Sequence, residues 1–252
     1  PGLRVIVTAG AAGIGEAIAR TFADRGGSVF ICDINETSLA KLAQERPDIG
    51  QVRADVSNEK QVENFFESAL NALGGLDVLI NNAGIAGPTA PIEEMSTEDW
   101  LRTIDINLNG HFYCLRRAIP HLKKTKDGVI INLSSVAGRL GFALRAPYAA
   151  TKWGIVGLTE SLAKELGSFG IRVNCLQPGV VQGDRIERVI GARAHATGED
   201  YHSVEQSILS NVSLKRTVLE QDIAEMALFL CTPMGANITG QSLSICAGVE
   251  TI

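Results

Sequence analysis

Short apolar runs rich in β-branched residues alternate with longer stretches of helical period along the chain. The short runs are typical of buried strands, and apolar residues that recur every three or four positions are typical of helices packed on a sheet. The expected strands lie near 4–8, 28–32, 51–54, 77–81, 128–133, 171–176 and 242–246. The expected helices lie near 14–25, 36–45, 58–73, 97–123, 148–168, 184–209 and 220–231. This alternation predicts an α/β fold, a doubly wound parallel sheet of seven strands with helices on both faces.

The alternation runs without interruption, so we expect one domain over residues 1–252. No Pro/Ser/Gly-rich linker, charge block or internal repeat divides the sequence. The segment near 184–211 differs from the other helical stretches because it carries many charged residues and two histidines. We expect this segment to cover the substrate, and its polarity favours a small polar substrate over a steroid or a fatty-acyl chain.

A glycine-rich turn follows the first expected strand and has the pattern G-x-x-G-x-G from Gly10 to Gly15. Such a turn lets the backbone approach a pyrophosphate and points a helix N-terminus at it. Asp33 ends the second strand, where a carboxylate would accept hydrogen bonds from the adenosine ribose of a dinucleotide. No Arg or Lys stands beside Asp33 to receive a 2′-phosphate. The sequence therefore favours NAD over NADP.

Tyr148 and Lys152 are four residues apart, on one face of an expected helix, and Ser135 precedes them. A phenol titrates near pH ~10, and a neighbouring cation lowers that value toward the range where acid–base catalysis is efficient. A serine hydroxyl can hold the oxygen of the reacting carbonyl or alcohol. The same spacing also occurs on exposed amphipathic helices, so the spacing alone does not identify a catalytic pair. Other residues of the sequence must support that interpretation.

The residues that support a catalytic role are polar and glycine positions at the ends of successive strands. Because ligands bind at the carboxyl edge of a parallel sheet, these positions should lie together at one edge. They are Gly10 to Gly15, Asp33, Asp55, Asn82, Ser135 and Pro178. The layout predicts a cofactor site and a reaction site on the same edge.

At this point the chain resembles the short-chain dehydrogenase/reductase family, and the resemblance covers nearly all of it. The matching pieces occur in the family's order: Thr8 to Gly15, Asp33, Asp55-Val56, Asn81-Asn82-Ala83-Gly84, Asn107, Ser134-Ser135, Tyr148 with Lys152, and Pro178-Gly179. The resemblance implies a Rossmann-type fold and an enzyme whose catalytic group is Asn107, Ser135, Tyr148 and Lys152. It also implies that Lys152 hydrogen-bonds the nicotinamide ribose and that Asn107 holds a water that relays protons.

The resemblance also implies a cofactor site and a substrate site. The cofactor residues would be Gly10, Ala12, Gly13, Ile14, Asp33, Ile34, Asp55, Val56, Asn82, Gly84, Tyr148, Lys152, Pro178, Gly179 and Val181. Asp55 would lie against the adenine edge, and Asn82 and Gly84 under the adenine-side ribose. The substrate would contact Ser135, Arg145 and Tyr148. Arg145 suits a carboxylate, phosphate or sulfonate, and the alternative is that it lies at the surface or between subunits.

Three positions depart from the family pattern. Ala9 stands where the first glycine is usual, which should alter the turn slightly. Gly183 stands where many members have a threonine for the nicotinamide carboxamide or phosphate, and backbone near Val181 would supply that contact instead. Cys246-Ala247-Gly248 replaces a usual Asp-Gly-Gly near the C-terminus, in a region of subunit contact.

Composition and charge agree with an enzyme of this kind. A net charge of −5 with mixed signs argues against nucleic acid or a membrane surface as the main partner, and no apolar run reaches the length of a membrane span. Five cysteines without metal-ligand spacing read as reduced residues of a cytoplasmic protein, and no metal site is expected. Pro1-Gly2-Leu3 leaves no room for a signal peptide before the first strand.

Helices near 97–123 and 148–168 carry apolar residues beyond one core-facing stripe, which predicts a second buried surface. In the family these helices pair across a two-fold axis and the C-terminal strand often forms a second interface, so the resemblance implies a homotetramer. A dimer is the alternative, because Cys246-Ala247 departs from the usual ending. The apolar residues in question are Ile104, Ile106, Leu108, Phe112, Tyr113, Trp153, Ile155, Val156, Leu158 and Leu162.

Three functions follow from these observations. The first is an NAD-dependent oxidoreductase that interconverts a secondary alcohol and a ketone, the alcohol being a hydroxy acid, polyol or sugar. The second is a reductase of a 3-oxoacyl thioester on an acyl-carrier protein, against which Asp33 argues because the usual cofactor is NADPH. The third is a nucleotide-binding regulatory protein without catalysis, which the presence of all four catalytic residues disfavours.

Overall fold

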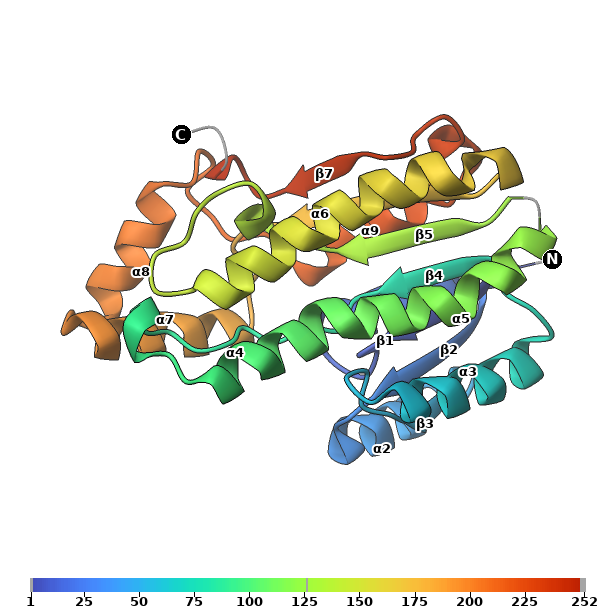
Figure 1. Cartoon of the computed structure of the whole chain (residues 1–252), viewed down its shortest axis with the longest axis horizontal. Helices are drawn as coiled ribbons and strands as arrows, with labels where there is room; N and C mark the ends of the chain where they lie inside the picture. Colours follow the sequence, from blue (N-terminus) through green and yellow to red (C-terminus); the bar gives the residue numbers. More distant parts are fainter. Residues whose placement is uncertain (1, 126, 250–252) are drawn as a thin grey trace.

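The computed structural model describes residues 2–125 and 127–249, and its centre is one parallel sheet (Figure 1). The strand order is β3-β2-β1-β4-β5-β6-β7. The strands are β1 (Arg4–Thr8), β2 (Ser28–Asp33), β3 (Gly50–Arg53), β4 (Val78–Asn81), β5 (Val129–Leu133), β6 (Arg172–Pro178) and β7 (Ser242–Ile245). Every predicted strand is present, and the predicted doubly wound parallel sheet of seven strands is confirmed. The terminal residues of the predicted domain, 1 and 250–252, lie outside the described residues.

The central strands are buried on both faces because helices cover both sides of the sheet. One cluster of buried side chains packs beneath α1 (Gly13–Asp24), α2 (Glu36–Glu45) and α9 (Glu220–Leu230). A second cluster packs on the opposite face beneath α3 (Glu59–Leu73), α5 (Gly110–Thr125) and α6 (Ala146–Leu166). Figure 1 shows α5 and α6 side by side in front of the sheet. Short 3₁₀ turns complete the connections at η1 (Ile92–Glu94), η3 (Val136–Gly138), η4 (Gly167–Phe169) and η5 (Pro233–Gly235).

The helix predicted near 97–123 is interrupted by a π turn. It consists of α4 (Thr97–Ile104), the π turn η2 (Asp105–Asn109) and α5. The Gly110 N–H donates to the Asp105 carbonyl, five residues back, instead of the usual four. Asn107 lies in this turn, so the local change of hydrogen bonding coincides with a residue predicted to be functional.

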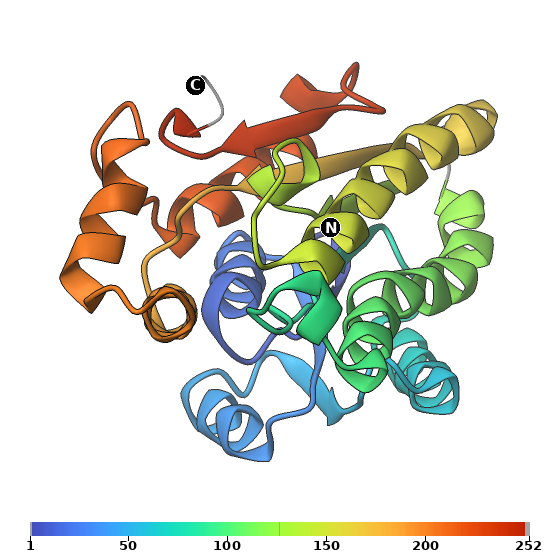
Figure 2. The same ribbon diagram turned by 60° about the vertical axis from the view of Figure 1, so that its left-hand side comes forward.

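The prediction of one helix near 184–209 is wrong, because the segment forms two helices. These are α7 (Asp184–Thr197) and α8 (Tyr201–Ser210), and we refer to them together as the covering helices. Gly198 takes a left-handed φ of 73°, which ends α7, and the Asp200 side chain accepts from the His202 and Ser203 N–H groups to cap α8. In Figures 1 and 2 the covering helices stand at the end of the molecule toward which the strand arrows point.

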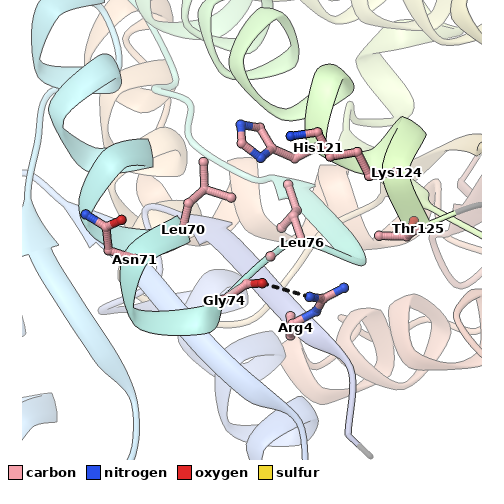
Figure 3. A pocket seen from close by; sticks show the side chains of 9 residues that line it. Arg4, Leu70, Asn71, Gly74, Leu76, His121, Lys124 and Thr125 are labelled. Carbon is pink, nitrogen blue, oxygen red and sulfur yellow. Dashed lines mark hydrogen bonds between the residues drawn. The ribbon is translucent and has the colours of Figure 1, made fainter.

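A surface pocket lies at the opposite, amino-terminal edge of the sheet (Figure 3). Its volume is about 560 Å³, and its lining includes Arg4, Leu70, Gly74, His121 and Lys124. Arg4 is already paired with Asp77 at 2.7 Å and donates to the Gly74 carbonyl. No predicted site residue lines this pocket. The predicted site residues lie instead at the carboxyl edge of the sheet.

Gly15 lies where α1 passes close to the end of β1, and this close approach gives a test of the fold. A Cβ at Gly15 would overlap the Ala9 carbonyl and the Asn82 amide, whereas a Cβ at Gly191 in α7 would meet no atom within 4 Å. We expect Gly15→Ala to lower the free energy of unfolding by about 1–3 kcal/mol, as overpacking does. Gly191→Ala should leave stability unchanged or raise it by up to ~1 kcal/mol. Urea unfolding of both variants measures the difference, and equal effects would contradict the described packing.

Candidate active site

The glycine-rich turn between β1 and α1 has no room for larger residues. A Cβ at Gly10 would lie 2.6 Å from Ile31 Cγ2, and Gly13 has a left-handed φ of 59°. Ala9 also takes a positive φ of 50°, a conformation that glycine adopts at less cost, so the departure of Ala9 from the family pattern is absorbed as backbone strain. The turn is thus shaped for the close approach of a ligand's phosphates, which is the fit that a dinucleotide requires.

Thr8 and Asn82 tie this turn to the end of β4. The Thr8 hydroxyl oxygen accepts from the Asn82 and Ala83 N–H groups, each at 3.0 Å. The Asn82 side-chain amide donates back to the Thr8 and Ala9 carbonyls, also at 3.0 Å. The Asn82 side chain therefore fixes the glycine-rich turn relative to the end of β4.

Asp33 is placed at the same turn by the end of β2. Its carboxylate is 9% exposed and accepts from the Ala11 N–H at 3.1 Å and the Asn35 N–H at 3.0 Å. The adjacent Ile34 is 55% exposed and offers an apolar surface beside the carboxylate. At the end of β3, Asp55 accepts from the Ser57 N–H and hydroxyl, which fixes its orientation.

Lys152 lies buried beneath the predicted reaction centre. The ammonium group, on the second turn of α6, donates to the Leu133 carbonyl at the end of β5, 2.7 Å away. Its nitrogen is 5.7 Å from the centre of the Tyr148 ring. The Lys152 carbonyl accepts from the Ser134 hydroxyl at 2.8 Å, so strand and helix are joined in both directions.

The Tyr148 phenol lies among several groups that alter its acidity. Burial alone would raise its pKa. The pKa is nevertheless below the usual value of 10, because the charges of Lys152, Arg185 and Arg145 and a hydrogen bond with Ser135 all lower it. The Lys152 pKa is also lowered, chiefly by burial. An anionic phenol beside an ammonium ion is a suitable proton acceptor.

Asn107 is fully buried, and its side chain is held by two segments. Its side-chain oxygen accepts from the Ile85 N–H at 2.7 Å, and its amide donates to the Ile85 carbonyl at 3.0 Å and to the Thr151 hydroxyl at 3.2 Å. A Cβ built on Gly84 would lie 3.2 Å from the Asn107 oxygen and 3.5 Å from Lys152 Nζ. The segment after β4 therefore lies beside both Asn107 and Lys152.

Two arginines approach the same centre. The Arg145 guanidinium carbon is 4.3 Å from the centre of the Tyr148 ring, and its Nη2 donates to the Ala86 carbonyl at 2.9 Å. Arg185, in the first turn of α7, donates to the Gly84 carbonyl. Arg145 therefore lies within the site and not on a remote surface.

The segment after β6 packs against the end of β7, beside the site. A Cβ at Gly179 would lie 2.6 Å from the Cys246 Cα, and the Gly179 N–H donates to the Ile245 carbonyl. Val181 pairs with Val218 in an isolated bridge. Gly183 has a φ of 129°, which other residues rarely adopt, so the local backbone accounts for glycine where threonine is usual.

The structure thus brings the predicted catalytic residues to one edge, and it gives roles to residues that had none in the sequence analysis. Thr8 and Ser134 were named there only as parts of motifs, and Thr151 was missed. All three act through the contacts above, and Thr151 also donates to the Tyr148 carbonyl at 2.8 Å. Thr151 is a small hydroxyl residue between Tyr148 and Lys152, and this position is the signal that the sequence offers. Within the described ranges, no cluster of potential metal ligands occurs and no helix is long and apolar enough to cross a membrane.

Comparison with known proteins places this geometry in a family. A family model described as enoyl-(acyl carrier protein) reductase matches residues 9–250. An uncharacterized oxidoreductase, YxjF of Bacillus subtilis, is 37% identical over 248 residues, covering 96% of each chain. The 3-oxoacyl-[acyl-carrier-protein] reductase of Chlamydia pneumoniae is 33% identical (98% of this chain, 97% of the relative). The 2-dehydro-3-deoxy-L-rhamnonate dehydrogenase (NAD(+)) of a Sphingomonas species is also 33% identical (98% and 94%).

Two solved structures have the same fold. An actinorhodin polyketide ketoreductase with NADPH superposes with a TM-score of 0.94 at 30% identity, covering 100% of this chain and 98% of that one. A NAD⁺-bound xylitol dehydrogenase superposes with a TM-score of 0.93 at 29% identity, covering 97% of both. The chain belongs to the short-chain dehydrogenase/reductase family, and it is an oxidoreductase that acts on CH–OH groups.

Proposed function

We propose that this enzyme is an NAD-dependent dehydrogenase that interconverts a secondary alcohol and a ketone on a small polar substrate, a hydroxy acid, polyol or sugar. The observation that carries the proposal is the placement of the Lys152 nitrogen 5.7 Å, and of the Arg145 guanidinium carbon 4.3 Å, from the centre of the Tyr148 ring. These cations lower the pKa of the phenol against the effect of burial. The cofactor would lie along the glycine-rich turn, with Asp33 toward its adenosine ribose. When bound there, its nicotinamide ring would accept or supply the hydride.

Each of the four catalytic side chains then has its own part in the proton transfer. In the oxidative direction the Tyr148 phenolate takes the proton of the substrate hydroxyl, while the Ser135 hydroxyl holds the same oxygen. Lys152 stabilises the phenolate by its charge. Asn107, fixed by Ile85 and Thr151, lies beside Gly84 and continues the polar path from Lys152 toward solvent as a proton relay.

The choice of NAD rests on Asp33. Its carboxylate is fixed at the turn by two backbone N–H groups and has no basic side chain beside it in the sequence. A 2′-phosphate there would face a negative charge, and Arg53, the partner of Asp33 on β3, is already paired with Glu36 at 3.0 Å. The relatives differ in this respect, since one solved structure contains NADPH and another NAD⁺, and a named relative uses NAD⁺.

The second candidate function is reduction of a 3-oxoacyl thioester, which a relative of similar length carries out. Asp33 and the polar covering helices argue for the first candidate. Arg145 adds to this, because a guanidinium beside the Tyr148 ring suits a substrate with an anionic group. A sugar-acid dehydrogenase among the relatives supports the same choice. The five free thiols favour a cytoplasmic location.

Cofactor choice gives the first test of this proposal. We expect NADH to bind at least ~10-fold more tightly than NADPH, a difference of ~1.4 kcal/mol. Combining Asp33→Ser with Ile34→Arg should narrow or invert the ratio, because it removes the carboxylate and adds a partner for the 2′-phosphate. Fluorescence titration measures both affinities. Equal affinities in the unmodified enzyme would rule out the assignment of Asp33.

The role of Tyr148 gives the second test. Tyr148→Phe should bind NADH normally but lose turnover by ~10²-fold or more, the scale of a lost acid–base group. In the unmodified enzyme the rate of alcohol oxidation should rise with pH through the lowered phenol pKa, because the phenolate is the proton acceptor, and then level off. Tyr201→Phe, in the exposed part of α8, is the matched control and should change neither rate nor profile. Full activity in Tyr148→Phe would show that another group carries the proton.

We also propose a homotetramer, with a dimer as the alternative. Phe112 and Trp153 are 47% and 51% exposed on neighbouring helices, which leaves an apolar surface on α5 and α6. Ile155 and Leu162, which the sequence placed in the same set, are instead buried, and Leu162 belongs to the core cluster beneath α6.

Assembly can be measured directly. Trp153→Glu should shift the particle to a smaller one in light scattering, because a charge would be buried at the interface. Met234→Glu, at a 72% exposed position elsewhere, is the control and should leave the mass unchanged. A monomer in the unmodified protein at micromolar concentration would refute this interface.

A further inference from the structure

Two arginines from different elements hold on to the same short segment above Tyr148. Arg145, just before α6, donates to the Ala86 carbonyl, and Arg185 of α7 donates to the Gly84 carbonyl. The two carbonyls are two residues apart, so their separation is at most about 7 Å. Both guanidinium groups are therefore anchored close together, beside the reacting centre.

No carboxylate in the described part of the chain balances the positive charge of this pair. Among the described residues no carboxylate forms an ion pair with Arg145 or Arg185, whereas Arg4, Arg46 and other surface arginines do have such partners. The buried Nε of Arg145 has no hydrogen-bond partner within the described part of the chain. Burial lowers the Arg145 pKa, the Tyr148 phenol opposes this by its charge, and Arg185 lowers the Arg145 pKa as expected of like charges in proximity. An anion between the two groups would relieve this imbalance.

The present contacts of the arginines are exchangeable. A backbone carbonyl is a neutral acceptor, and a carboxylate or another oxyanion makes hydrogen bonds with a guanidinium that are about twice as strong. Arg145 is held by stacking on Tyr148, but Arg185 is exposed and belongs to the covering helices. Arg185 is therefore the group that can change partner.

We propose that Arg185 is a specificity-determining residue, which leaves the Gly84 carbonyl and joins Arg145 in holding one oxyanion group of the substrate beside Tyr148. This inference rests on the proposed function, because it assigns the substrate of the same site. The covering helices follow Arg185, since Ile190, Ala194 and Val204 form a cluster of their own and make them a unit. Recognition of the anion and positioning of the covering helices are then one event.

Binding of inorganic sulfate to the NADH-saturated enzyme tests this without turnover. Saturation with NADH keeps sulfate from the phosphate positions of the cofactor, and equilibrium dialysis with labelled sulfate measures the affinity. We expect Arg145→Gln and Arg185→Gln each to weaken sulfate binding by ~10-fold or more, equal to ~1.4 kcal/mol. Arg188→Gln, one turn further along α7 and also exposed, is the matched control and should stay within ~2-fold. Unchanged sulfate affinity in Arg185→Gln, or an equal loss in Arg188→Gln, would overturn the proposal.

A pair of substrates that differ in charge separates specificity from a merely structural role. The carboxylate substrate is 3-hydroxybutyrate, and the neutral one is 2-butanol. Arg185→Gln should raise KM for 3-hydroxybutyrate by ~10-fold or more, and it should lower kcat/KM for 3-hydroxybutyrate at least ~10-fold more than kcat/KM for 2-butanol, which loses only the effect of Arg185 on the Tyr148 pKa. An equal loss for both alcohols, or weaker NADH binding with normal sulfate binding, would assign Arg185 to the structure or the cofactor and overturn the inference.

Failure of the proposed function would look different. If neither alcohol is oxidised while sulfate still requires both arginines, the anion site stands and the proposed dehydrogenase function fails. If Tyr148-dependent oxidation of neutral alcohols is found and sulfate binding ignores Arg185, the function stands and the inference fails.

Discussion

The junction between β1 and β4 is the constraint on which the rest of the structure depends. The sheet order reverses there, because β2 and β3 lie on one side of β1 and the later strands lie on the other. At such a point the connections leave in opposite directions and open a crevice at the carboxyl edge. Reciprocal hydrogen bonds between Thr8 and Asn82 hold the two sides of this crevice together. The glycine-rich turn and the segment from Gly84 to Ala86 thereby share one rigid frame.

Most of the fold could be predicted from the sequence because a parallel sheet leaves a simple pattern. Strands buried on both faces appear as short apolar runs, so all seven were found close to their observed bounds. The π turn at Asn107 had no such pattern, and the Asn107 side chain in this turn bonds to the backbone of Ile85, 22 residues away in the sequence. The break between α7 and α8 was missed although Gly198 and Asp200 are ordinary stop and start signals.

The candidate site likewise has residues whose positions the sequence could predict and contacts that it could not. Residues at strand ends, such as Asp33 and Ser135, could be brought together by topology alone. Contacts between distant segments could not, and the bond from Arg185 to Gly84 spans 101 residues. The sequence suggested Lys152 as the single cation that acts on Tyr148. The structure shows a balance instead, in which burial opposes the combined effect of Lys152, Arg185, Ser135 and Arg145.

The separate packing of the covering helices has a consequence for how the molecule comes apart and how it diversifies. Their small cluster of Ile190, Ala194 and Val204 is not part of either main cluster on the sheet. Such a unit can open locally at a fraction of the global free energy of unfolding. On the assignment of Arg185 proposed above, mild heat or denaturant should then erase substrate recognition while the crevice at β1 and β4 stays folded. On the same assignment, substitutions in α7 and α8 would alter which substrate is accepted without disturbing the sheet.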